Sequence, residues 1–149
     1  MDNIIVYLDD ADYALEMLQP MLPEGNGRTA LRWILVGCAP RVTHHASKWV
    51  TQRARQSWRE KWGETAFSRL LPLLRQQGDT VLTELAGKCL REQTTSLIRT
   101  HGAARVLDAR RPKFGQDLQA VTAAQPRTNH SVLGYAAAIA GAGLLLAAD

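Results

Sequence analysis

The most constraining feature of this sequence is a short apolar run near its beginning, from Ile4 to Leu8, followed directly by Asp9 and Asp10. A run of this length, rich in β-branched residues, is typical of a central strand that is buried on both faces of a parallel sheet. The two carboxylates mark the point where the strand leaves the core at its carboxyl end. In open α/β sheets, this is the edge over which ligands bind.

The residues that follow alternate between helix-like and strand-like segments. Asp10 or Asp12 is placed to cap the first helix, which is expected over residues 11–22. The other expected segments are strands at 30–37, 79–86 and 103–109, a long helix from Ser47 to Gly78, a helix at 89–101 and a weaker helix at 114–124. Strand–helix–strand units place their strands parallel. The pattern therefore predicts a three-layer α/β/α fold around an open parallel sheet of four to five strands.

The long helix is predicted from apolar residues at every fourth position. These residues are Val50, Ala54, Trp58, Trp62, Ala66, Leu70 and Leu74. Such a stripe is expected to face the sheet, with the intervening arginines outside it. Pro72 is expected to kink or end the helix.

The last part of the chain differs in composition from the rest. We expect an α/β domain over residues 1–125, a linker over 126–131 and an apolar C-terminal segment over 132–149. From Val132 to Ala148 the sequence contains no charged side chain, and a helix of 17 residues would span about 25 Å. Two interpretations stay open: an anchor in the inner face of the cytoplasmic membrane, or a helix or strand packed on the domain.

Charge and cysteine content limit the compartment and the partners. The formal net charge is +4, but residues 41–75 carry eight Lys and Arg against two Glu. This segment would suit nucleic acid, with Trp49, Trp58 and Trp62 available for stacking on bases. Trp58 and Trp62 lie on the apolar stripe, however, so we favour core packing and no nucleic-acid partner. Two distant cysteines, Cys38 and Cys89, favour reduced thiols in a cytoplasmic protein.

No arrangement of residues indicates catalysis or metal binding. His44 and His45 are adjacent and would point in different directions, and the other two histidines are remote in sequence, so we expect no metal site. Ser47, His45 and Asp9 have no spacing that fixes a triad, and no phosphate-loop or nucleophile-elbow motif occurs. We therefore expect a protein that is not an enzyme, with Cys38 as a structural thiol.

Two groups of residues do point to binding, because both follow strands. Asp9 follows the first strand, and Arg110, Arg111 and Lys113 follow the fourth. In a parallel sheet, both groups lie at the carboxyl edge. There a carboxylate can accept hydrogen bonds from ribose hydroxyls or an adenine amine, and guanidinium groups can hold phosphates.

Together these residues resemble the universal stress protein family, a branch of the adenine nucleotide α-hydrolase-like superfamily. The resemblance covers residues 3–115 and rests on the strand ending in Asp9, the second strand at 33–36, the long helix and Leu85-Ala86-Gly87. It implies a nucleotide site for ATP or AMP and a homodimer. The implied site residues are Leu8, Asp9, Val36, Ala109, Arg110, Arg111 and Lys113. The glycines that hold the phosphates in ATP-binding members are absent after residue 109, which implies a weak or vestigial cleft.

The sequence therefore predicts a non-catalytic, universal-stress-like regulatory or binding domain with a weak adenine-nucleotide cleft. One alternative is an adaptor that the segment from Val132 to Ala148 holds at the membrane. A second alternative is nucleic-acid binding through the basic helix within residues 41–75.

Overall fold

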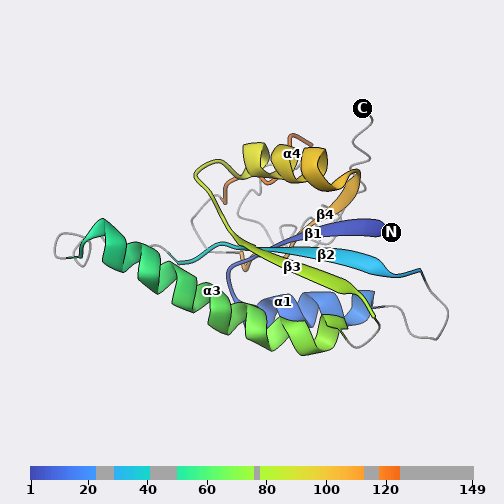
Figure 1. Cartoon of the computed structure of the whole chain (residues 1–149), viewed down its shortest axis with the longest axis horizontal. Helices are drawn as coiled ribbons and strands as arrows, with labels where there is room; N and C mark the ends of the chain where they lie inside the picture. Colours follow the sequence, from blue (N-terminus) through green and yellow to red (C-terminus); the bar gives the residue numbers. More distant parts are fainter. Residues whose placement is uncertain (23–28, 41–49, 76–77, 113–117, 125–149) are drawn as a thin grey trace.

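The computed structural model describes residues 1–22, 29–40, 50–75, 78–112 and 118–124. Its elements are β1 (Asp2–Leu8), α1 (Ala11–Leu18), the short 3₁₀ helix η1 (Gln19–Met21), β2 (Leu31–Gly37), α3 (Gln52–Arg75), β3 (Thr80–Leu85), α4 (Leu90–His101) and β4 (Ala104–Asp108). The sheet forms the middle layer, with α1 and α3 on one face and α4 on the other (Figure 1). The predicted three-layer α/β/α fold is confirmed.

The sheet has four parallel strands in the order β3-β2-β1-β4. As predicted, β1 is a central strand: Ile5 lies between Ile34 of β2 and Val106 of β4. This is the order of the first four strands in a doubly wound α/β fold. The chain moves outward from β1 to β3 and then returns to place β4 on the other side of β1. The switch point of the topology therefore lies between β1 and β4.

Alternating residues of β1 supply both hydrophobic cores, because successive side chains of a strand point to opposite faces. Ile4, Val6 and Leu8 pack towards α1 and α3. Ile5 and Tyr7 pack towards α4. Each of the last four residues of this strand is completely buried, which is why the run contains no charged side chain.

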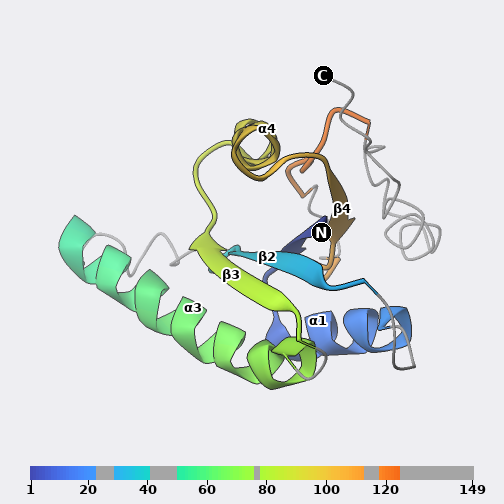
Figure 2. The same cartoon turned by 45° about the vertical axis from the view of Figure 1, so that its right-hand side comes forward.

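Helix α3 is longer than the sheet that it covers. Its 24 residues span about 36 Å, whereas a seven-residue strand spans about 23 Å. The C-terminal half packs on the sheet through Ala66, Phe67 and Leu70, but the N-terminal half extends beyond it (Figures 1 and 2). Trp58 is 42% exposed, so the prediction that the whole apolar stripe faces the sheet was wrong.

The stripe also turns away from the sheet for a geometric reason. At 100° per residue, every fourth position advances about 40° around the helix, so a row of such positions is inclined to the helix axis. Trp62 still packs against the core, whereas Ala54 and Trp58 point elsewhere. The regular spacing therefore predicted the helix correctly. It predicted the buried face correctly only for the C-terminal half of the helix.

Several predicted boundaries shift for local reasons. Asp10 caps α1, as predicted, but the α-helix ends at Leu18, before Pro20 of the 3₁₀ helix η1. Helix α3 begins after Thr51, whose hydroxyl accepts a hydrogen bond from the amide of Ala54 at 3.2 Å. The predicted cap at Ser47 lies outside the described residues. Pro72 does not end the helix, which continues to Arg75.

Two predictions concern the C-terminal part of the chain. Residues 118–124 form bends and turns with no helix, so the predicted helix over 114–124 is wrong for this part. The predicted linker and the apolar segment from Val132 to Ala148 lie outside the described residues. Among the helices that the structure does describe, none is long and apolar enough to cross a membrane.

Candidate functional site

The candidate site lies at the carboxyl edge of the sheet, between β1 and β4, where doubly wound folds bind ligands. The structure places Asp9 and Arg111 side by side there, although 102 positions separate them in the sequence. The backbone amide of Arg111 donates a hydrogen bond to Oδ1 of Asp9 at 2.8 Å. Parallel pairing of β1 and β4 explains this contact, because it brings the ends of the two strands together.

Asp10 and Arg111 form the exposed part of this edge. Asp10 accepts hydrogen bonds from the amides of Asp12 at 2.9 Å and Tyr13 at 3.2 Å, so its charge lies at the positive end of α1. Nε of Arg111 lies 3.8 Å from Oδ2 of Asp10. The Arg111 guanidinium also lies 5.9 Å from the centre of the Tyr13 ring. At 60% exposure, the Arg111 side chain is an accessible cation at this edge.

Arg110 points the other way, into the protein. Its Nε and Nη2 donate to the two carboxylate oxygens of Asp108 at 2.8 and 2.9 Å, and both side chains are buried. Burial alone would lower the pKa of the Arg110 guanidinium, but the hydrogen bond and charge of Asp108 outweigh this effect and raise the pKa. Arg110 was predicted to hold a phosphate at the site. In this structure its charge is neutralised by Asp108.

The apolar residues that the resemblance implied lie beneath this edge. Leu8, Val36 and Ala109 have no exposed surface. Val36 packs on the α4 side of the sheet, and the other two pack on the α1 side. These side chains therefore belong to the two hydrophobic cores and present no surface to a ligand. Lys113 lies outside the described residues.

Cys38 follows β2 at the same edge, and its amide donates to the carbonyl of Leu8 at 2.7 Å. Burial raises the pKa of the Cys38 thiol to about 12, and the nearby Asp9 carboxylate acts in the same direction. The neutral thiol is therefore stable at physiological pH, which makes it a poor nucleophile. This chemistry supports the expectation that Cys38 is structural.

Residues 118–124, which the sequence did not connect with the site, lie between the end of β4 and α4. Residues 118–124 are held there by Gln119, whose carbonyl accepts a hydrogen bond from Nη2 of Arg110 at 2.5 Å. The Gln119 side chain also contacts the amide of Leu90 at 3.4 Å, at the beginning of α4. Next to it, the carbonyl of Val121 lies 2.7 Å from the Thr94 hydroxyl. The latter is also 2.6 Å from the Tyr7 hydroxyl.

The sequence contained a partial signal for these residues. A tyrosine inside an apolar strand indicates that its hydroxyl must find a partner, and Asp108 two positions before Arg110 offers a carboxylate. Nothing local identified Thr94 or Gln119, because their partners are distant in sequence. Asp79, at the opposite edge of the sheet, was missed for the same reason. It accepts hydrogen bonds from the Leu31 amide and the Trp33 indole, each at 2.9 Å.

The described residues provide hydrogen-bonding groups and one accessible cation at this edge. Within them, no group of three or more His, Cys, Asp or Glu side chains is placed to hold a metal ion. The arrangement fits recognition of a polar ligand by Asp9 and Arg111. Comparisons with protein-family models, with curated proteins and with solved structures found no match to this chain.

Proposed function

We propose that the protein is a non-catalytic, universal-stress-like binding domain whose site between β1 and β4 takes the nucleoside part of an adenine nucleotide weakly. The observation that carries this proposal is the meeting of Asp9 and Arg111 at the switch point of the sheet. A carboxylate at this position can accept hydrogen bonds from ribose hydroxyls. The fully buried side chains of Leu8 and Val36 hold the ends of β1 and β2 in the core next to it.

The charges at this edge favour the nucleoside over the phosphates. Asp9 and Asp10 place two carboxylates there, and the accessible guanidinium of Arg111 is already near Asp10. Arg110 is neutralised by Asp108. The sequence has no glycine between Ala109 and Pro112, so this loop lacks the residue that most readily lets backbone amides approach a phosphate. We therefore expect adenosine, AMP and ATP to bind with similar, millimolar affinity.

Titrations of the full chain with the three ligands, followed by amide chemical shifts in NMR, test this proposal. The expected result is a set of shifts that centres on Asp9, Asp10 and Arg111, with dissociation constants within about threefold of one another. Asp9→Asn keeps an oxygen for the Arg111 amide but removes the charge, and it should weaken binding about tenfold. Asp2→Asn, at the opposite end of the same strand, is the matched control and should bind as the unmodified protein does.

Two results would overturn the proposal. One is the absence of any shift at 5–10 mM ligand, well above the roughly millimolar dissociation constant expected. The other is a shift pattern centred away from the β1–β4 edge. If ATP binds more than about 30-fold tighter than adenosine, the site has a phosphate cradle and the preference for the nucleoside is wrong.

A further inference from the structure

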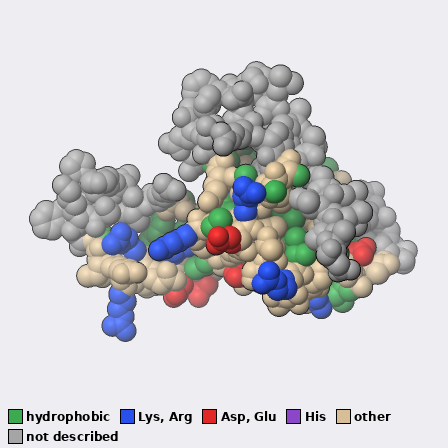
Figure 3. Space-filling model, turned by 90° about the horizontal axis from the view of Figure 1, so that it is seen from above, with side chains coloured by type: hydrophobic (Ala, Val, Ile, Leu, Met, Phe, Trp, Pro, Cys, Tyr) green, Lys and Arg blue, Asp and Glu red, His purple; other side chains and the backbone are tan. Residues whose placement is uncertain are grey.

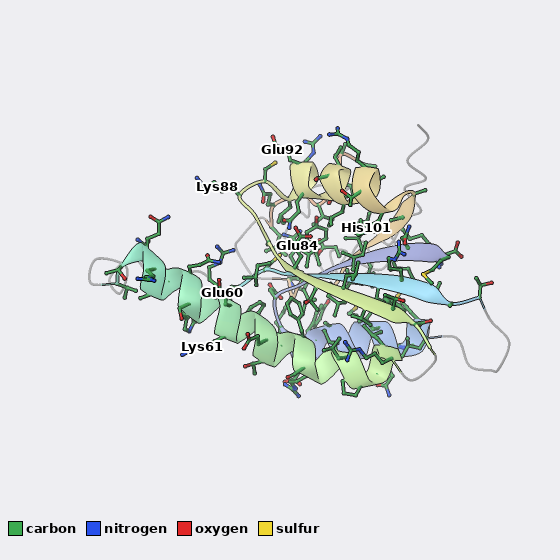
Figure 4. The ribbon with its side chains drawn as sticks, viewed as in Figure 1. Glu60, Lys61, Glu84, Lys88, Glu92 and His101 are labelled. Carbon is green, nitrogen blue, oxygen red and sulfur yellow. The ribbon has the colours of Figure 1, made fainter. Side chains whose placement is uncertain are left out.

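The N-terminal half of α3 presents a surface that the proposed nucleotide site does not use. We call residues 52–61 the α3 arm. The arm extends past the sheet (Figure 1). Figure 4 shows Lys61 at the C-terminal end of the arm, with Lys88 of the β3–α4 loop above the arm in this view. Arg59 ties the arm to the domain, because its Nη2 donates to the carbonyl of Ala86 at 2.7 Å. The arm therefore projects beyond the sheet and is attached to the domain by this hydrogen bond.

The arm carries a strong positive charge. It contains four cations, Arg53, Arg55, Arg59 and Lys61, against Glu60 alone. No acidic residue lies in the first turn of α3, although a carboxylate there would stabilise the helix dipole and arginines oppose it. Seen from above, Lys and Arg side chains lie at this end of the molecule (Figure 3). The clustered positive charge near the N-terminus of α3 lowers the stability of the helix. A bound anionic partner would supply the negative charge that stabilises a helix N-terminus.

An exposed aromatic side chain lies among these cationic side chains. Trp58 is 42% exposed, and Arg55 and Lys61 are three residues before and after it, so the three side chains form one row on the helix. Glu60 lies on the opposite side, since two residues correspond to about 200° around a helix. Its carboxylate accepts a hydrogen bond from Gln56 at 3.2 Å. In the part of the chain that the structure describes, neither Arg55 nor Lys61 forms an ion pair.

We propose that the α3 arm binds single-stranded nucleic acid, with a base stacked on Trp58 and phosphates held by Arg55 and Lys61. Aromatic side chains within a cationic surface are the usual means of binding single strands without sequence preference. An anionic membrane fits the arm less well. Helices that lie in a membrane surface need a broad apolar face, and the arm has only Ala54 and Trp58 as apolar residues.

The test is fluorescence anisotropy of a labelled 15-nucleotide oligo-dT or oligo-U with the full chain. We expect micromolar binding at 50 mM salt. With two phosphates neutralised by Arg55 and Lys61, the logarithm of the association constant should fall with the logarithm of salt concentration at a slope of about −1.4. Trp58→Ala should weaken binding about tenfold, whereas Trp58→Phe should keep it within about threefold.

The control distinguishes a defined surface from general attraction by a basic protein. Arg55→Gln with Lys61→Gln should lower affinity at least tenfold. Arg91→Gln with Arg99→Gln on α4 removes the same charge elsewhere and should change affinity less than about twofold. Circular dichroism melting checks that each variant folds. Asp9→Asn should leave this binding unchanged, which separates it from the nucleotide site.

Three outcomes would overturn the proposal. The first is no binding at 50 mM salt with 50 μM protein. The second is an equal loss in the two double variants, which would mean that only net charge matters. The third is tight binding to phosphatidylserine vesicles without binding to either oligonucleotide, which would identify a membrane surface instead.

Discussion

Two adjacent arginines after β4 have opposite roles, because successive residues of an extended backbone point to opposite sides. Arg111 faces solvent beside Asp10, and Arg110 is buried against Asp108. Their order in the sequence therefore decides which guanidinium can meet a ligand. When one partner of a buried ion pair is removed, the charge of the other partner remains buried without compensation.

Arg110→Met should lower the free energy of unfolding by about 3–5 kcal/mol, because it leaves the Asp108 carboxylate buried without its main partner. Combining it with Asp108→Asn should restore a large part of this loss. Urea denaturation of the two single variants and the double variant measures the coupling. Arg111→Met is the control and should cost less than about 1 kcal/mol, since its side chain is 60% exposed. Equal costs for the two arginines would contradict the buried pair.

At the scale of the element, α3 combines two functions in one continuous helix. Its C-terminal half supplies core residues such as Phe67, and its N-terminal half supplies the charged arm. The point of change is set by the length of the strands that α3 covers. Gly37 and Gly63 let the helix approach closely there: a Cβ on Gly37 would lie 2.9 Å from the Phe67 ring.

Leu70→Ala should therefore destabilise the protein much more than Trp58→Ala, although both residues lie on the same apolar stripe. Leu70 is fully buried, and truncation there should cost about 2–5 kcal/mol in transfer and cavity free energy. Trp58 is half-exposed, and its truncation should cost less than about 1 kcal/mol. Chemical denaturation monitored by circular dichroism measures both. A cost above 2 kcal/mol for Trp58→Ala would show that the arm packs on the domain.

At the scale of the whole molecule, the two faces of β1 differ in chemistry. The buried residues of β1 on the α1 side, Ile4, Val6 and Leu8, are all apolar, whereas the α4 side contains the hydroxyl of Tyr7, bonded to Thr94. Burial raises the pKa of Tyr7 from 10.0 to about 12, as it raises that of Cys38 from 9.0 to about 12. Folding therefore favours the protonated forms of both groups.

This predicts a loss of stability at alkaline pH. Below pH 9 both groups are protonated in the folded and unfolded states, so their contribution to the free energy of unfolding is fully present. Between pH 9 and 12 the unfolded chain releases protons that the folded protein retains, so the free energy of unfolding falls as pH rises. Urea midpoints at pH 8, 9.5 and 10.5 should decline, and less steeply for Tyr7→Phe with Cys38→Ala. An identical decline in that variant would assign the effect to other groups.

The sequence by itself determined what depends on local chemistry. The apolar run at 4–8 predicted a buried central strand, Asp10 was identified as a candidate cap of the first helix, and the alternation of segments predicted the parallel α/β fold. It also predicted that Asp9 and the arginines after β4 share one edge. All of these depend on periodicity, caps and strand direction, which neighbouring residues specify.

Only the tertiary structure decided which side chains are buried, because burial depends on the surface that packs against them. Periodicity cannot tell how far a sheet extends, so it could not show that the stripe of α3 is buried at Leu70 and exposed at Trp58. It also could not show that Arg110 is buried with Asp108 and meets the Gln119 carbonyl, because the path of residues 118–124 across the end of β4 sets that burial and that contact. A side chain is buried or exposed according to what packs on it, and packing is a property of the whole fold.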